Sequence, residues 1–127
     1  MPAIRLEHVN ITVSNVENSA AMLSAIFGWH ERWRGSPAQG GGSTIHLGDD
    51  TSYVALYTGP DDQHANVHWT KGVPLNHVGV EVDDLDATEA RVAAAGLTPF
   101  AHGDYTPGRR FYFFDPDGIE WEVISYA

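Results

Sequence analysis

The 127-residue sequence has no cysteine, few basic residues and no long apolar run. Without cysteine there is no disulfide framework and no thiolate ligand, so any metal must be held by histidine, aspartate or glutamate. No run approaches the roughly 18 apolar residues that a membrane-spanning helix needs, which argues against a membrane partner. The opening residues, Met1 to Arg5, lack the basic and then apolar pattern of a signal peptide. These features predict a cytoplasmic protein.

Positive charge is scarce. Seven lysines and arginines stand against 17 aspartates and glutamates, which gives a formal charge of −10. Such an acidic chain repels phosphate backbones, and no basic stripe interrupts it, so nucleic acid is not an expected partner. The acidity favours solubility, and it can also attract a cationic ligand. The length is that of one domain, and we expect a single domain over residues 1–127.

The chain contains an internal repeat. A shift of 69 positions places Leu6 on Leu75, His8 on His77, Val9 on Val78 and Val13 on Val82. Each of these apolar-alternating segments ends in polar residues that can cap a helix. Helices are predicted from Val16 to Phe27, ended by Gly28, and from about Leu85 to Ala95, ended by Gly96. Strands are then predicted within HERWRGS, TIHL and SYVALY in the first half, and within LTPFAHG, RRFYFF and IEWEVIS in the second.

Each half therefore has the order β-α-β-β-β. Module one covers residues 1–59, a connector rich in polar residues covers 60–74, and module two covers 75–127. We predict an α+β fold in which the two modules form a curved, eight-stranded mixed sheet, an open barrel or cup. The helices cover its outer face, which leaves the inner face free for a ligand.

Strand alternation places an unusual number of polar side chains on the face away from the helices. This face is predicted to carry His8, Asn10, Thr12, His77, Gly79, Glu81, Arg110, Tyr112, Phe114, Glu120 and Glu122. Two imidazoles at repeat-equivalent positions and one carboxylate are a common ligand set for a divalent metal ion. Spacing alone does not separate Glu120 from Glu122. His46 is expected to point to the apolar side of its strand and to be structural.

Three segments, EHVNITVSNVENS, NHVGVEVDDLDA and FYFFDPDGIEWEVI, resemble the vicinal oxygen chelate superfamily of glyoxalase I, bleomycin resistance proteins, extradiol dioxygenases and fosfomycin resistance enzymes. The resemblance implies a cup around a divalent ion (Fe2+, Mn2+, Ni2+ or Zn2+), often within a homodimer. It assigns the ligand positions to His8, His77 and Glu122. The position of a fourth carboxylate ligand in glyoxalase I falls on Ala55, which disfavours that activity because isomerisation needs a positioned base.

The resemblance to the fosfomycin enzymes also assigns substrate contacts to Asn10 and Tyr112. We expect Glu120 to act as general base and Arg110 to bind a substrate carboxylate or phosphate, or else to pair with Glu120 or Glu122. Thr106, in a loop at the mouth of the cup, is a further candidate for substrate binding. Two histidines of the connector, His64 and His68, can join the site of a neighbouring chain.

Two functions are compatible with this pattern. The first is a metal-dependent enzyme, an isomerase, lyase or dioxygenase, acting on a small molecule that chelates the ion through neighbouring oxygens. The alternative is a metal-free binding protein similar to the bleomycin resistance proteins, which sequesters a cationic or aromatic compound.

Overall fold

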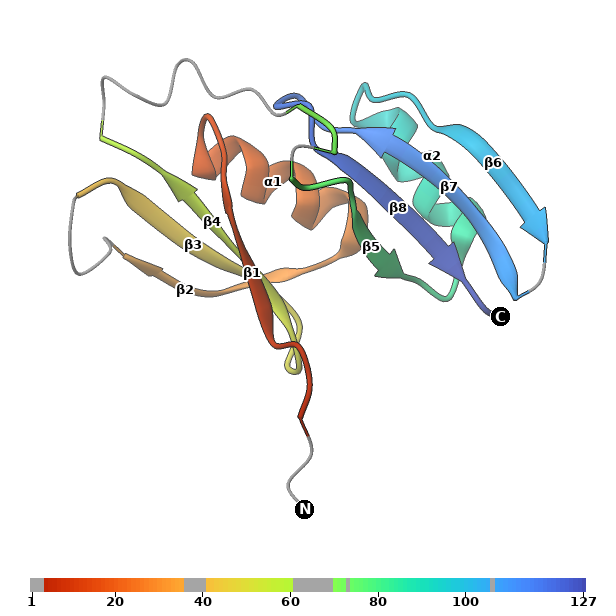
Figure 1. Ribbon diagram of the computed structural model, residues 1–127, viewed down its shortest axis with the longest axis horizontal. Coiled ribbons are helices and arrows are strands. Elements are labelled where there is room, and N and C mark those ends of the chain that lie inside the picture. Colours follow the sequence, from red (N-terminus) through yellow and green to blue (C-terminus); the bar gives the residue numbers. More distant parts are fainter. Residues whose placement is uncertain (1–3, 36–40, 61–69, 73, 106) are drawn as a thin grey trace. The chain divides into compact units, whose positions relative to one another are not determined.

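The computed structural model describes residues 4–35, 41–60, 70–72, 74–105 and 107–127 (Figure 1). These residues fall into two units, each with the predicted order β-α-β-β-β. The first unit contains β1 (His8–Thr12), most of α1 (Val16–Phe27), β2 (His30–Gly35), β3 (Ser43–Gly48) and β4 (Tyr53–Thr58). The second contains β5 (Val78–Glu81), α2 (Leu85–Ala94), β6 (Phe100–Tyr105), β7 (Gly108–Phe114) and β8 (Glu120–Ser125), together with the last residues of α1, Ala25–Phe27.

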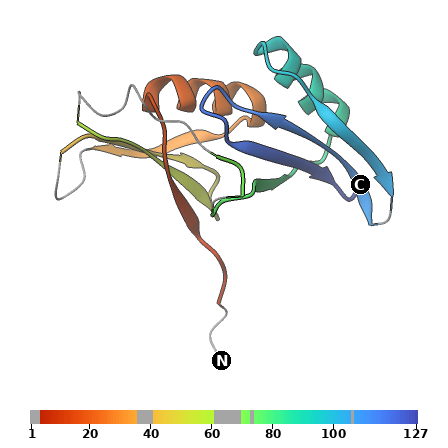
Figure 2. The same ribbon diagram turned by 45° about the horizontal axis from the view of Figure 1, so that its top comes forward.

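Each unit has one mixed four-stranded sheet. The strand orders are β1-β4-β3-β2 and β5-β8-β7-β6, so the two halves repeat one topology. In both sheets the first strand pairs in parallel with the last, and the remaining pairs are antiparallel. Figure 2 shows α1 along one face of the first sheet and α2 along one face of the second. Within the described residues, the predicted eight strands and two helices are confirmed.

Both helices begin and end at the predicted signals. The side chain of Asn15 accepts a hydrogen bond from the Asn18 N–H at 2.9 Å, and α1 ends at Gly28, whose φ of 71° is left-handed. In α2 the side chain of Asp84 caps the N-terminus. The helix stops one residue before the predicted end, and Gly96 takes the left-handed conformation with φ of 83°. In the described part of the chain, no helix is both long and apolar enough to cross a bilayer.

One face of each sheet is apolar and buried. Strand alternation explains this division, because paired residues on neighbouring strands share a face. In the first unit the buried face contains Ile11, Ile45, Leu47, Val54 and Leu56. In the second it contains Val80, Phe111, Phe113, Trp121 and Val123. The opposite faces carry the histidines and carboxylates that the sequence singled out.

A turn built on Asp115 joins β7 to β8. Its buried carboxylate accepts hydrogen bonds from the backbone N–H groups of Asp117 (2.9 Å) and Ile119 (3.0 Å), and from the Trp121 indole N–H (3.1 Å). Burial raises the pKa of Asp115, and the three hydrogen bonds act in the opposite direction. Because one carboxylate holds both the turn and the Trp121 ring, it fixes which residues of β8 face the core. Glu120 and Glu122 are thereby left on the other face.

Candidate metal centre

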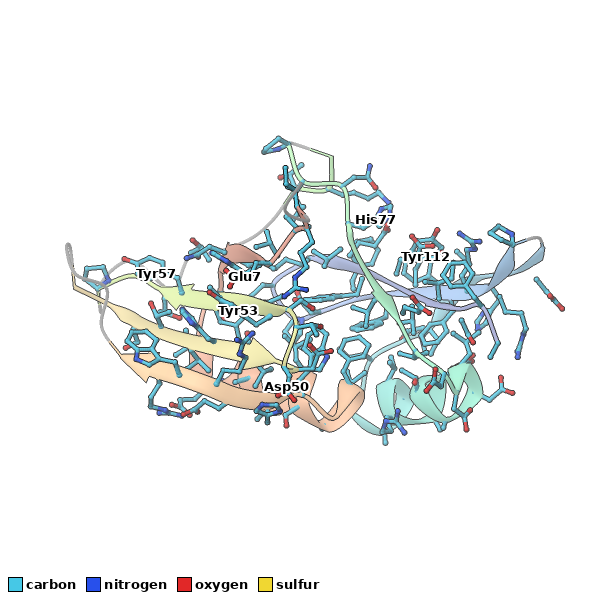
Figure 3. All side chains as sticks on the ribbon, turned by 90° about the horizontal axis from the view of Figure 1, so that it is seen from below. Glu7, Asp50, Tyr53, Tyr57, His77 and Tyr112 are labelled. Atoms are coloured by element: carbon cyan, nitrogen blue, oxygen red, sulfur yellow. The ribbon has the colours of Figure 1, made fainter. Side chains whose placement is uncertain are left out.

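The second unit brings together two of the three predicted ligands. His77 lies immediately before β5, and Gly79 of that strand pairs with Glu122 on β8. The His77 Nε2 atom lies 3.0 Å from Glu122 Oε1. Glu122 is largely buried, whereas His77 is about one-third exposed. Figure 3 shows His77 at the head of β5 and Tyr112 on β7.

This geometry suits two ligands of one ion. Metal–nitrogen and metal–oxygen bonds of about 2.1 Å that meet at a right angle place their donor atoms about 3.0 Å apart. The observed separation of Nε2 and Oε1 is 3.0 Å. Space is also available, because a Cβ added at Gly79, opposite Glu122, would meet nothing within 4 Å. The donor set and the space therefore fit a divalent metal ion.

The side chain before each candidate histidine holds the other ring nitrogen. Asn76 Oδ1 lies 2.8 Å from His77 Nδ1, and Glu7 Oε1 lies 2.9 Å from His8 Nδ1. When Nδ1 carries the proton and donates to these oxygens, Nε2 presents its lone pair to an ion. Asn76 and Glu7 are related by the same shift of 69 positions as the histidines. Neither residue was predicted from the sequence, although their places directly before the two histidines were a usable signal.

Arg110 and Tyr112 on β7 flank the pair. The Arg110 Nη1 atom donates to Glu122 Oε2 at 3.0 Å, so the second carboxylate oxygen is held by a largely buried guanidinium. The pairing of Arg110 with Glu122, one of the two predicted alternatives, is therefore confirmed. The Tyr112 ring meets the His77 ring edge-on, with centroids 5.8 Å apart. Both β7 residues therefore lie on the same face as the candidate ligands.

Glu120 is buried beside His77 and pairs with a lysine. Its carboxylate is 4% exposed, and Oε2 lies 3.8 Å from His77 Nδ1 and 2.5 Å from Lys71 Nζ. The ammonium group compensates the cost of burying this carboxylate. Glu120 thus points to the face that the prediction required of a general base. Lys71 is a site residue that sequence reasoning missed, because its segment has no periodicity that would assign it to a face.

The first unit places His8 at the start of an aromatic row. The rings of His8 and Tyr53 stack with centroids 4.8 Å apart, Tyr53 and His46 stack at 4.6 Å, and His46 lies 4.9 Å from Trp33. Figure 3 shows Tyr53 on β4. The row crosses all four strands, and the Arg32 guanidinium lies 4.6 Å from the centre of the Tyr53 ring.

The prediction for His46 is wrong. It pairs with Ala55, which pairs with Asn10, and all three therefore share the face of His8 rather than the apolar face. Its neighbours Ile45 and Leu47 take the apolar side, each 2% exposed. Desolvation is the main cause that lowers the pKa of His46, and the nearby His8 and Arg32 lower it further. These effects favour the neutral form of the His46 imidazole, which lies on the candidate-site side of the first sheet.

The predicted three-ligand set draws on both units. His8 belongs to the first unit, and His77 and Glu122 belong to the second. Among the residues that the structure describes, no group of three or more histidine, aspartate and glutamate side chains is placed to hold an ion. The convergence of the three ligands stays a prediction. The predicted roles of Thr106, His64 and His68 concern residues outside the described ranges.

Comparison with known protein families shows which family the chain belongs to. A sequence model of the glyoxalase/bleomycin resistance protein/dioxygenase superfamily matches residues 5–123. The chain belongs to this superfamily. The match extends over both units and includes His8, His77 and Glu122. Comparison with curated proteins found no match.

Solved structures share the fold at low sequence identity. A glyoxylase/bleomycin resistance protein/dioxygenase domain from Frankia sp. EAN1pec has a TM-score of 0.82 and 23% identity, covering 98% of this chain and 93% of that chain. The fosfomycin resistance protein FosX from Listeria monocytogenes, complexed with Mn(II) and sulfate, has a TM-score of 0.75 and 17% identity, covering 98% and 93%. FosX from Mesorhizobium loti has a TM-score of 0.73 and 21% identity, covering 97% and 92%. These similarities establish the superfamily fold for this chain.

Proposed function

We propose that this member of the superfamily is a metal-dependent enzyme of the glyoxalase/dioxygenase type. Its ligands are His8, His77 and Glu122, and the ion is Fe2+, Mn2+, Ni2+ or Zn2+. The Mn(II) in the FosX structure from Listeria monocytogenes supports a divalent ion in this fold. The proposed substrate is a small molecule that chelates through neighbouring oxygens. We also propose a homodimer.

The observation that carries this proposal is that both histidines make the same contact through the Nδ1 atom. Each Nδ1 atom is held by the side chain of the preceding residue, and His77 Nε2 lies 3.0 Å from Glu122 Oε1. Metal-binding histidines almost always have such a partner, because the second hydrogen bond orients the ring and raises the basicity of the ligand nitrogen. Here the same arrangement occurs at both repeat-equivalent histidines.

The surrounding residues have distinct proposed roles. A bound divalent ion would polarise the chelating oxygens and stabilise negative charge that develops on the substrate. Arg110 holds Glu122 through one oxygen and lies close enough to the site to attract an anionic substrate group. Glu120 is the proposed general base, oriented by its ion pair with Lys71. Tyr112 and Asn10, on the same faces as His77 and His8, are the proposed substrate contacts, and Thr106 is retained as a third.

Isomerisation of the glyoxalase I kind is not the proposed reaction. Ala55 is 2% exposed and lies between Asn10 and His46 on neighbouring strands. A methyl side chain there can neither bind an ion nor accept a proton, so the first sheet offers no carboxylate at this position. Lyase and dioxygenase reactions, in which a three-ligand site leaves positions open for substrate, fit the residues better.

One observation favours the alternative function. The row formed by His8, Tyr53, His46 and Trp33 is a ladder of rings on one face of the first sheet, and Trp33 is 49% exposed. Such a surface suits a flat aromatic compound. A metal-free binding protein would use this row and would not require His77 to approach Glu122. Metal content separates the two functions.

The test is metal binding measured by calorimetry and elemental analysis on protein purified without chelator. We expect one equivalent of divalent metal per chain. His8→Ala, His77→Ala and Glu122→Ala should each weaken binding by about 100-fold or more, since changes in the outer shell already cost 10–100-fold. Asn76→Ala should fall in that smaller range.

His102→Ala is the matched control, because His102 Nε2 also lies 3.0 Å from a carboxylate, that of Glu89, but away from the site. Its metal affinity should equal that of the wild type. Glu120→Ala should keep the metal and slow turnover. A wild type without stoichiometric metal, whose ligand variants behave like the His102 control, would exclude the enzyme and leave the aromatic-binding function.

A further inference from the structure

A second aromatic row lies beside the candidate ligands in the second unit. The Tyr112 ring, edge-on to His77, has its centroid 6.0 Å from that of Phe100, and Phe100 stacks on Phe114 at 5.2 Å with an interplanar angle of 12°. Phe100 pairs with Tyr112 across β6 and β7, and Phe114 pairs with Glu120 across β7 and β8. The three rings therefore continue the face that carries Glu120 and Glu122. We call Phe100, Tyr112 and Phe114 the aromatic shelf.

One ring of the shelf, Phe114, is exposed, and the rings of Phe100 and Tyr112 are half-buried. Phe114 is 43% exposed, whereas Phe111 and Phe113 on the opposite face of β7 are fully buried. The core therefore does not need the Phe114 ring. Large apolar side chains that gather at the surface beside a polar site are typical of a ligand-binding surface.

The backbone of β6 is distorted next to the shelf. Phe100 pairs with Tyr112 and Gly103 pairs with Arg110, so three steps along β6 match two along β7, and one residue is extra. Within this bulge Ala101 has a φ of 54°, a left-handed conformation that is unfavourable for alanine. Bulges turn side chains to new directions and are frequent beside active sites. Here the bulge directly follows Phe100, whose ring joins the other two.

The space beside the shelf is suited to a small molecule. Gly79 carries no side chain, and a Cβ built there would meet nothing within 4 Å, although this residue pairs with Glu122. A ligand bound at the His77 and Glu122 pair would therefore have Arg110 along β7 on one side of Tyr112 and Phe114 on the other. The charged side suits oxygens, and the side with the rings suits a flat apolar group.

We infer that the aromatic shelf is a subsite for a planar ring, so that the substrate is an aromatic compound whose neighbouring oxygens chelate the ion. This inference rests on the proposed metal-dependent function. Phe114 and Phe100 supply the stacking surface, and Tyr112 lies between the ring subsite and the metal ligands. An aliphatic chelator of the same charge would bind to the ion without using the shelf.

The test compares two hydroxamates that share one chelating group, benzohydroxamate with a phenyl ring and acetohydroxamate with a methyl group. Binding to the manganese-loaded protein is measured by calorimetry. We expect Phe114→Ala to weaken benzohydroxamate binding about 10-fold, from ring stacking and lost burial, and to leave acetohydroxamate within about twofold. Phe100→Leu should show the same selective loss.

Tyr126→Ala is the matched control, because Tyr126 is an exposed ring (53%) outside the shelf. It should change neither affinity. If metal is bound but Phe114→Ala and Phe100→Leu weaken both hydroxamates equally, or neither, the ring subsite is refuted and the metal site stands. If the wild type binds no metal, the proposed function fails and the inference fails with it.

Discussion

The Asp115 carboxylate offers a quantitative test of how the turn before β8 positions the site. Asp115→Ala removes the acceptor of three hydrogen bonds, from the N–H groups of Asp117 and Ile119 and from the Trp121 indole. Asp115→Asn keeps the shape and one acceptor oxygen. In the structure Oδ1 accepts both backbone N–H groups, and Oδ2 accepts the indole. The asparagine amide can therefore serve the turn, but its NH2 group would face the indole N–H.

The expected losses follow from these bonds. Three buried donors left without a partner, at about 1 kcal/mol or more each, give a loss of about 3 kcal/mol for Asp115→Ala. Asp115→Asn leaves one donor unpaired and should lose about 1–2 kcal/mol. The pKa of Asp115 is raised in the folded protein, so its titration favours folding below the unfolded pKa, and that contribution is lost as the pH rises through the folded pKa. The loss of unfolding free energy in Asp115→Asn, relative to the wild type, should therefore be larger in mild acid than at pH 7.

The assay is urea unfolding followed by circular dichroism and tryptophan fluorescence, with metal affinity measured on the folded variants. Because the turn sets the phase of β8, Asp115→Ala should also weaken metal binding, whereas Asp115→Asn should largely preserve it. Equal losses of stability for the two variants would refute the assignment of Oδ1 to the turn and of Oδ2 to the indole. An unchanged stability of Asp115→Ala would refute the structural role of the carboxylate altogether.

Two further predictions concern local backbone. Ala101→Gly should stabilise the protein by about 0.5 kcal/mol, because relief of the left-handed strain exceeds the entropic cost of glycine, and a loss of stability would contradict that reading. Ala94→Gly, in α2, is its control and should cost about 1 kcal/mol. The Asp49 carboxylate accepts hydrogen bonds from the Ser52 and Thr51 N–H groups, and these bonds lower the pKa of Asp49. The contribution of Asp49 to folding stability is therefore present above its unfolded pKa and is lost as the pH falls through its folded pKa. Asp49→Ala should lower the free energy of unfolding by about 1 kcal/mol at neutral pH, as measured by urea unfolding. If the variant were still less stable than the wild type in strong acid, the ionised carboxylate would not be the cause.

The sequence was sufficient to predict the elements of the fold because local signals agreed with one another. The α1 boundaries follow from apolar spacing between Asn15 and Gly28, and both lie where the structure has them. The same alternation placed His77 and Glu122 on one face of their sheet, as the structure confirms. Such inferences succeed because a strand with one buried face tolerates no slip of register.

The wrong face of His46 and the missed role of Lys71 have different causes, a misaligned register and an irregular segment. His46 was assigned to the wrong face because Ile45 was aligned with Tyr112, whereas the pairing with Ala55 makes His46 the counterpart of Tyr112. A shift of one residue reverses every side chain of a strand. The contact of Lys71 with Glu120 could not be predicted either, because Lys71 precedes β5 in an irregular segment.

The ion pair between Lys71 and Glu120 has a practical consequence for chemistry on this protein. The sequence contains a single lysine, and its ammonium lies against a carboxylate next to the candidate ligand His77. A reagent that acylates amines would therefore modify one side chain, Lys71, besides the terminal amine of the chain, and would neutralise the partner of Glu120. The rate at which Lys71 is acylated, compared with and without added ions or small molecules, would then report whether the candidate site is occupied.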